Sequence, residues 1–181
     1  HRIVEVSDIH CAHFTMLPVI FKRNGVVIPD QELLRFIDLT QKKDLYAEIA
    51  KGADGFGRDD IKPVMQPFFS IKDEGQFLFD AERGRHIVLD FFKRNYPHIL
   101  QGLLDWHGRF PGVSIKSVAN KVESDIMNPI CDRLRGLGLH PFRIHDAVYL
   151  PEDETCKVDF DINKAVFDYI NRNGTASSPL C

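Results

Sequence analysis

Hydrophobic and polar positions recur with a helical spacing over most of the chain and alternate over a few short stretches. Residues 2–6 are rich in β-branched side chains and roughly alternate, which predicts a strand that ends near Asp8. Residues 141–151 predict two further short strands, with His145 and Asp146 at their junction. The pattern therefore predicts an α+β fold with few strands and many helices.

Apolar residues at helical spacing predict the other elements. We expect helices over residues 12–22, 30–50, 79–106, 115–137 and 163–171, a loop over 52–57 and a disordered tail over 174–181. Pro18 predicts a kink or a first helical turn, and Asp30 predicts a capping carboxylate. Breaks are expected around Thr40 and Pro97.

The composition fits one soluble domain with a sizeable core, because the 181 residues are 44% hydrophobic and 27% charged. The formal net charge of −3 excludes a wholly basic nucleic-acid coat but leaves room for a locally basic groove. The four cysteines form no CxxC pair, so the sequence indicates neither a zinc knuckle nor a disulfide framework and is typical of a reducing compartment. No apolar run approaches the roughly 20 residues that span a bilayer, and no signal peptide is visible. The chain starts at His1 rather than Met, so we expect that upstream residues are missing.

Two acids at predicted strand ends are the first candidates for chemistry. Asp8 follows the first strand, and Asp146 lies between the last two. A carboxylate buried at a strand end is costly unless it is paired, hydrogen-bonded or bound to a metal. On adjacent strands the two charges would be offset by divalent cations, the arrangement of two-metal phosphoryl or nucleotidyl transfer. Each aspartate taken alone also fits a turn or capping role.

Five motifs in the surrounding sequence resemble those of family A DNA polymerases, the DNA polymerase I-like group, in a divergent and compact form of the phage or mobile-element type. They follow the order of that family: Asp8-Ile-His-Cys-Ala-His-Phe-Thr-Met-Leu17, Asp44-Leu-Tyr, Arg58-Asp-Asp-Ile-Lys62, Asn120-x4-Asp125 and Phe142-Arg-Ile-His145-Asp146. The resemblance implies a right-hand polymerase palm, with a small antiparallel sheet and helices, plus reduced fingers and no thumb. It assigns residues 1–29 to the first palm motif, 30–114 to a fingers-like helical region, 115–172 to the last palm motif and 173–181 to a tail.

The resemblance also implies how the candidate site residues act. Asp8, Asp146 and the backbone carbonyl of Ile9 would hold two Mg²⁺ ions, for which Mn²⁺ can substitute. Lys62 would neutralise charge on the incoming triphosphate, and Arg58 would grip its outer phosphates as a planar fork.

Three further residues are implied to contact the substrates. His13 stands where the family places a Glu that blocks a ribose 2′-hydroxyl, so deoxynucleotide preference is expected. His145 would lie near the primer terminus, and Asn120 would contact template or primer. The implied partners are a primed DNA template and dNTPs, in the cytoplasm of a bacterial or phage-infected cell and away from any membrane. Because the sequence offers nothing that corresponds to a thumb, an upstream region is expected to help hold the duplex.

The sequence departs from the family pattern in the fingers and beside the last aspartate. Pro63 and Pro67 fall where the fingers helix should run unbroken, and a proline in a helix interior removes a backbone hydrogen bond and clashes. Ser70 stands at a position that is aromatic in the family, and Ala147 stands where Glu often follows His-Asp. The palm is therefore better supported than the fingers.

Three alternative functions stay open. Cys11 and His13-Phe14 also resemble the first motif of single-subunit RNA polymerases. The same two acids would serve a Mg²⁺-dependent nuclease. In a non-catalytic nucleic-acid-binding module, Asp8 and Asp146 would be structural.

Several candidate residues also have a purely structural interpretation. Arg58 and Lys62 fit a solvated helix face. Phe68 and Phe69 are more typical of a hydrophobic core than of a base-stacking surface. Glu123 fits either a solvated or a bridging role.

Overall fold

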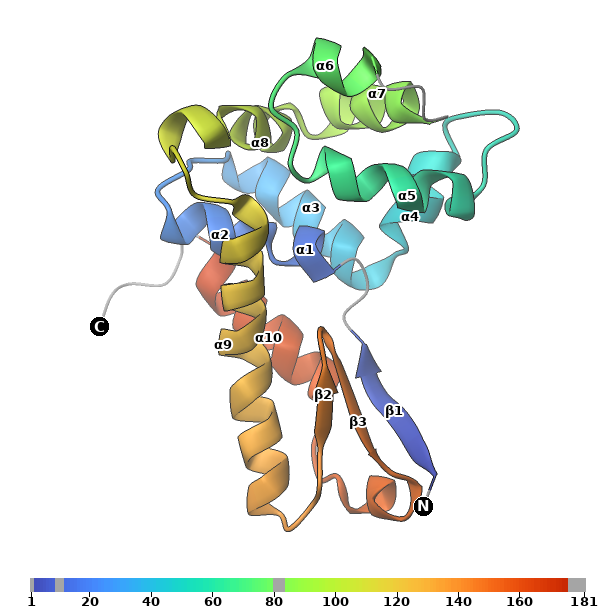
Figure 1. Ribbon diagram of the computed structural model, residues 1–181, viewed down its shortest axis with the longest axis vertical. Helices are drawn as coiled ribbons and strands as arrows, with labels where there is room; N and C mark the ends of the chain where they lie inside the picture. Colours follow the sequence, from blue (N-terminus) through green and yellow to red (C-terminus); the bar gives the residue numbers. More distant parts are fainter. Residues whose placement is uncertain (1, 9–11, 80–83, 176–181) are drawn as a thin grey trace.

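The computed structural model describes residues 2–8, 12–79 and 84–175, and it confirms the α+β class (Figure 1). Most of the described chain is helical, and a small antiparallel sheet stands beside the long helix α9, Ile115–Gly136. None of the helices within these described ranges is both long and apolar enough to cross a bilayer.

The sheet joins the first strand of the chain to a hairpin late in the sequence. Its strands β1 (Ile3–Asp8), β2 (Phe142–Ile144) and β3 (Ala147–Pro151) have the order β1-β3-β2, and both pairs are antiparallel. In the register of β1 with β3, Asp8 faces Ala147, and a bulge between Glu5 and Ser7 shifts the pairing. The predicted strands are therefore confirmed, and the last two form a hairpin whose two loop residues are His145 and Asp146.

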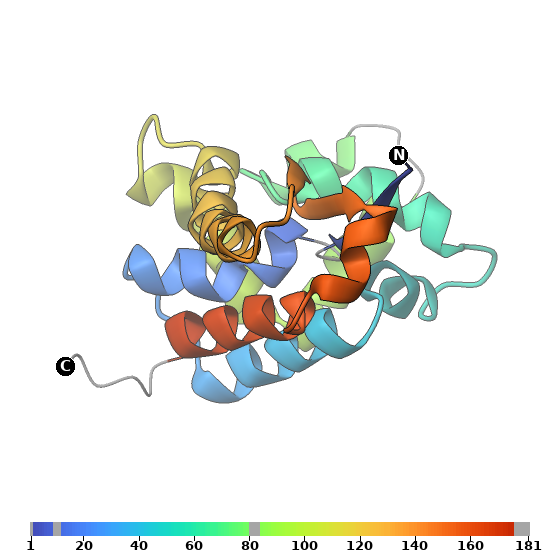
Figure 2. The same cartoon turned by 90° about the horizontal axis from the view of Figure 1, so that it is seen from below.

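The remaining described elements are helices. They are α1 (Ala12–Thr15), α2 (Leu17–Arg23), α3 (Asp30–Lys42), α4 (Leu45–Ala50), α5 (Arg58–Phe68), α6 (Glu74–Phe79), α7 (Arg85–Asn95), α8 (Pro97–Arg109), a 3-10 helix η1 (Glu152–Lys157) and α10 (Ile162–Gly174). Figure 2 shows the sheet end of the molecule from below, with α9 seen along its axis and α10 beside α3. Gln41 of α3 donates a hydrogen bond to Asn171 of α10 over 3.2 Å, which ties these two helices together.

Two helix boundaries and one loop were predicted correctly. Pro18 lies in the first turn of α2, where its missing N–H has no helical partner to lose. The break at Pro97 separates α7 from α8. The loop over residues 52–57 is also confirmed, whereas most of the predicted tail lies outside the described residues.

One prediction about α3 was wrong, and another was displaced by a few residues. Asp30 does not cap the helix through its side chain; Pro29 is the N-cap, and Asp30 is the first helical residue, where its negative charge faces the positive end of the helix dipole. The break expected around Thr40 is present, but it lies after Lys42, between α3 and α4. Thr40 is buried and its hydroxyl donates to the Ile37 carbonyl, 3.3 Å away, so this polar group is satisfied inside the helix.

Helix α5 continues through Pro63 and Pro67, so the expected interruption is absent. One proline costs a helix interior about 3 kcal/mol. Four side chains of the same helix are fully buried, and each contributes roughly 1.5–3 kcal/mol; they are Ile61, Val64, Met65 and Phe68. Burial of this face therefore outweighs the two lost hydrogen bonds.

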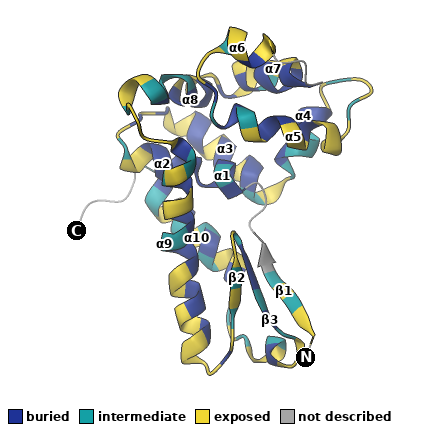
Figure 3. Cartoon of the chain, in the orientation of Figure 1, coloured by how far each residue is buried: buried dark blue, intermediate teal, exposed yellow. Residues whose placement is uncertain are grey.

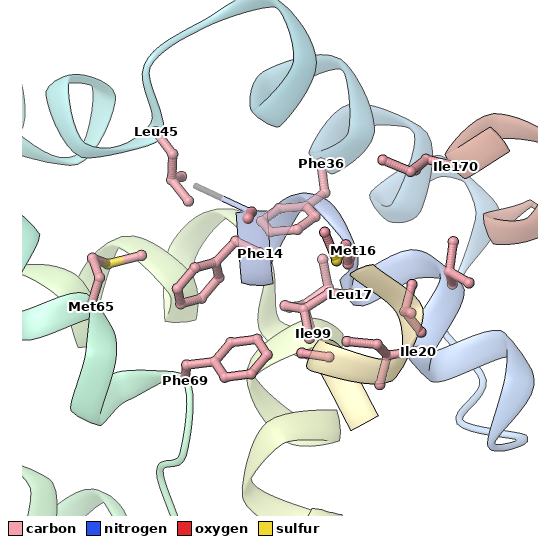
Figure 4. Packing of buried hydrophobic residues seen from close by; sticks show 14 of the residues in the cluster. Phe14, Met16, Leu17, Ile20, Phe36, Leu45, Met65, Phe69, Ile99 and Ile170 are labelled. Carbon is pink, nitrogen blue, oxygen red and sulfur yellow. The ribbon is translucent and has the colours of Figure 1, made fainter. Parts of the chain in front are cut away.

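The hydrophobic core lies where helices from both halves of the chain meet. In Figure 3 the buried residues follow β3 and the inner faces of the helices. Figure 4 shows side chains of α1, α2, α3, α5, α8 and α10 converging on one cluster. Phe68 and Phe69 are 0% and 1% exposed and pack against Phe14, which confirms that they belong to the core.

Candidate functional site

A cavity of about 530 Å³ opens where α1, α4, α5 and α9 face the turn between β2 and β3. In Figure 1 this turn points from the sheet toward α1. The cavity is lined by Ala12, His13, Phe14, Tyr46, Arg58, Lys62, Met65, Gln66, Phe69, Asn120, Glu123, His145 and Asp146. It therefore gathers six of the eight residues that the sequence nominated for the site: His13, Arg58, Lys62, Asn120, His145 and Asp146.

The strand register brings the backbone of the other aspartate to the same place. The Cα of Asp8 faces the Cα of Ala147, the residue that follows Asp146. Hydrogen-bonded strands lie about 4.8 Å apart, so Asp8 and Asp146 are neighbours in space although they are far apart in the sequence. Ile9, the other proposed metal ligand, lies outside the described residues.

The turn that carries Asp146 has an unusual backbone. His145 adopts a φ of 53°, the left-handed region that non-glycine residues rarely enter. This conformation costs an ordinary L-residue roughly 1–2 kcal/mol, so the surrounding structure must hold it. The side chain of His145 is exposed and borders the cavity, while Asp146 is half-buried.

The two basic residues of α5 differ in their surroundings. Arg58 donates from Nε to Oδ2 of Asp44 over 2.5 Å and lies over the Tyr46 ring, 5.4 Å from its centroid. Lys62, one helical turn further, is exposed and has no hydrogen bond or ion pair with any residue that the structure describes. Of these two residues, Lys62 is the one that can meet an anionic ligand without first leaving a partner that the structure describes.

Asp44 has a double role that the sequence motif did not reveal. Its Oδ1 accepts the backbone N–H groups of Tyr46 and Ala47, so it caps α4, and its Oδ2 accepts from Arg58. Partial burial raises the pKa of the Asp44 carboxyl, but the hydrogen bonds from Arg58 and Ala47 outweigh this effect and hold the pKa below its ordinary value. The pair places the first turn of α5 against α4.

His13 and Asn120 complete the rim from two other helices. The His13 ring stacks on Phe69 with centroids 5.0 Å apart and an angle of 24° between the planes. This contact fixes the orientation of the His13 ring at the cavity wall. Asn120 is exposed on the first half of α9, whereas Asp125 lies away from the cavity and pairs with Arg23 of α2.

Three cavity residues were given no role by the motif comparison or were left undecided, and one of them, Tyr46, stands in a quoted motif. Tyr46 and Gln66 line the wall from α4 and α5, and the helical spacing of Gln66 from Lys62 was a signal for its placement. Glu123 is buried rather than solvated and pairs with Arg143. The sequence could not reveal this pair, because its members approach only after β2 folds back along α9.

Few side chains that could bind a metal ion are gathered near the turn. Within residues 2–8, 12–79 and 84–175, no three His, Cys, Asp or Glu side chains come close enough to form a metal-binding cluster. A magnesium site that takes one or two carboxylates and completes its shell with water and substrate phosphate needs no such cluster. The neighbouring positions of Asp8 and Asp146 fit a site of that kind.

The Asp44 cap gives a prediction on stability. Asp44→Ala should lower the free energy of unfolding by about 1 kcal/mol, because α4 loses its cap. Asp44→Asn should lose less, because asparagine caps equally well and only the charge disappears. Because folding lowers the pKa of Asp44, its charge stabilises the wild type above the ordinary pKa of 3.8 and ceases to do so as the pH falls through the folded-state value.

Urea titrations from pH 7 down to pH 3 measure this effect. The wild-type advantage over Asp44→Asn should shrink as the pH falls below 3.8. Asp54→Asn, an exposed change in the loop before α5, should show no comparable trend. A pH-independent difference between wild type and Asp44→Asn would contradict the role of the charge.

No family model, curated protein or solved structure matches this chain. The geometry of the cavity is therefore the basis for assigning a function.

Proposed function

We propose that this chain is the palm and reduced fingers of a template-directed DNA polymerase of the family A type. The observation that carries the proposal is the composition of one cavity. The resemblance rests on five separate motifs, and the cavity wall contains residues of all five. Four of them contribute from α1, α5, α9 and the β2–β3 turn, and Asp44-Leu-Tyr contributes Tyr46 from α4. Such a grouping supports a shared site, because these segments are distant in the sequence.

In this proposal Asp8 and Asp146 form the catalytic end of the cavity. Their carboxylates, together with the carbonyl of Ile9, would hold two Mg²⁺ ions, or Mn²⁺ in their place. When bound, these ions supply the Lewis acid that activates a primer 3′-hydroxyl and offsets the charge of a triphosphate. The antiparallel register supports this assignment, because it pairs Asp8 of β1 with Ala147 of β3, the residue that follows Asp146 of the turn.

The opposite wall suits the nucleotide. Lys62 presents an ammonium group to the phosphates, and Arg58 reaches them when it exchanges the Asp44 carboxylate for phosphate oxygens. His13, held against Phe69, takes up the space where a ribose 2′-hydroxyl would lie, which favours dNTP over NTP. Asn120 and His145 border the remaining side, where the primer terminus and the template base would be contacted.

Primer extension tests the proposal. The full chain is incubated with a labelled primer annealed to a longer DNA template, with Mg²⁺ and either dNTPs or NTPs. We expect template-dependent lengthening of the primer with dNTPs and little with NTPs. Preferential use of NTPs would indicate the RNA polymerase alternative instead.

Two further outcomes would overturn the proposal. Shortening of the primer in the absence of any triphosphate would identify a nuclease. Binding of the primed template without any change in its length, in the presence of Mg²⁺ or Mn²⁺, would identify a non-catalytic binding module.

A further inference from the structure

Arg143 of β2 ties the turn that carries Asp146 to α9. Its Nε donates to the His145 carbonyl over 2.9 Å. Its two terminal nitrogens donate to three side chains of α9: Glu123 over 2.6 Å, Asn128 over 2.8 Å and Ser124 over 3.3 Å. A single guanidinium therefore links the backbone of the turn to the longest helix of the described chain.

The attachment is partly buried and needs an arginine. The side chain of Glu123 is 9% exposed and that of Arg143 is 22% exposed, so each charge depends on the other. The planar guanidinium offers its donors in fixed directions, and here they serve both the turn and the helix. A lysine has one charged nitrogen and cannot hold the same set of acceptors at once.

The same attachment counteracts the strain in the turn. The left-handed φ of His145 is unfavourable for this residue, and the hydrogen bond from Arg143 ends on the carbonyl of that same residue. Arg143 does not line the cavity, whereas Glu123, His145 and Asp146 do. Any influence of Arg143 on a ligand must therefore pass through the residues that it holds.

We propose that Arg143 and Glu123 are positioning residues that fix the His145–Asp146 turn relative to the Asn120 face of α9. The inference rests on the proposed function for its metal-binding role. A displacement of about 1 Å in a catalytic group can reduce a rate on the order of 100-fold. Loss of the guanidinium should therefore reduce turnover and metal affinity while leaving the wall formed by α5 intact.

The test compares wild type with Arg143→Lys and Glu123→Gln. Arg133→Lys is the matched control, because Arg133 is an exposed arginine of α9 that pairs with Asp159 at 3.2 Å, away from the cavity. Three quantities are measured: the thermal unfolding midpoint, the binding of Mn²⁺ alone by electron paramagnetic resonance, and primer extension as a function of Mg²⁺ and dNTP concentration.

We expect Arg143→Lys to weaken Mn²⁺ binding about tenfold and to lower kcat by about 10- to 100-fold, with KM for dNTP within about twofold of wild type. Glu123→Gln should show a smaller change in the same direction, because an amide oxygen can still accept from Arg143. Arg133→Lys should match wild type in all three measurements. Simple loss of folded protein would reduce the number of Mn²⁺ sites without changing their affinity.

The outcomes separate this inference from the proposed function. If wild type binds Mn²⁺ at a site that Asp146→Asn removes and Arg143→Lys weakens, the positioning role stands even when no primer is extended. If folded Arg143→Lys binds Mn²⁺ with wild-type affinity, the positioning role is wrong whatever the activity. Absence of any Mn²⁺ binding by wild type would overturn both.

Discussion

Asp146→Asn is expected to abolish primer extension, with a fall in rate of at least about 10³-fold. Metal-ion catalysis supplies several kcal/mol of transition-state stabilisation, and each tenfold in rate corresponds to about 1.4 kcal/mol. Asparagine keeps the size of the side chain but removes the charge that would hold the metal. Asp8→Asn should have an effect of the same order, because the strand register makes the two residues neighbours. Single-turnover primer extension at saturating Mg²⁺ measures both variants.

Asp159→Asn provides the control for this experiment. Asp159 is an exposed carboxylate that pairs with Arg133 and does not line the cavity. Its replacement should leave the extension rate within about twofold, as expected for a surface substitution. Wild-type activity in Asp146→Asn would show that the aspartate of the turn is structural.

Lys62→Met is expected to lower kcat/KM for dNTP by about 10- to 100-fold. A hydrogen bond to a charged group is worth about 1.5–3 kcal/mol, and no described residue competes for the Lys62 ammonium group. The exposed position on α5 means that the free energy of unfolding should change by no more than about 0.5 kcal/mol. The substitution should weaken the binding of dNTP more than the binding of a nucleoside that lacks phosphates. The inhibition constant of each compound in a competition assay measures this difference.

Lys72→Met is the matched control for this second experiment. Lys72 is an exposed lysine shortly after α5 and lies outside the cavity. The two substitutions remove the same charge from the protein, so a general electrostatic effect would appear in both. If Lys62→Met has the same kcat/KM for dNTP as wild type, the assignment of α5 to nucleotide binding is wrong. The assignment of Asp8 and Asp146 to metal binding would not be affected by that result.

Elements with a long or strongly patterned sequence were predictable. The helix expected over residues 115–137 is α9, Ile115–Gly136, because apolar residues repeat along one face for its whole length. The hairpin around His145 and Asp146 followed from two β-rich runs separated by a short polar junction. In both cases the local pattern and the tertiary packing favour the same structure.

Features that depend on distant contacts were not predictable. Residues 12–22 form two short helices divided at Met16, a buried residue whose own pattern gives no break. The course of α5 through Pro63 was also unforeseen, because it depends on burial of the opposite face rather than on local propensity.

The residues of the candidate site also fall into a predictable and an unpredictable group. Individual residues such as Lys62 and Asp146 could be nominated from motifs, because the required chemistry restricts the residue type. The partners that position them could not, since Asp44 reaches Arg58 and Arg143 reaches Glu123 only through the folded backbone. Supporting contacts of this kind have no fixed spacing in the sequence.

The prolines of α5 have a mechanical consequence. Pro63 and Pro67 cannot donate to the carbonyls of Asp59 and Pro63, so two consecutive turns on one side of the helix lack their axial hydrogen bonds. A helix is least resistant to bending where such bonds are missing. Bending at this point would swing the first turn, with Arg58, while the buried Met65 and Phe68 stay anchored in the core. The C-terminal half of α5 is therefore held in the core while its first turn bends more easily, and this difference is set by two prolines that do not line the cavity.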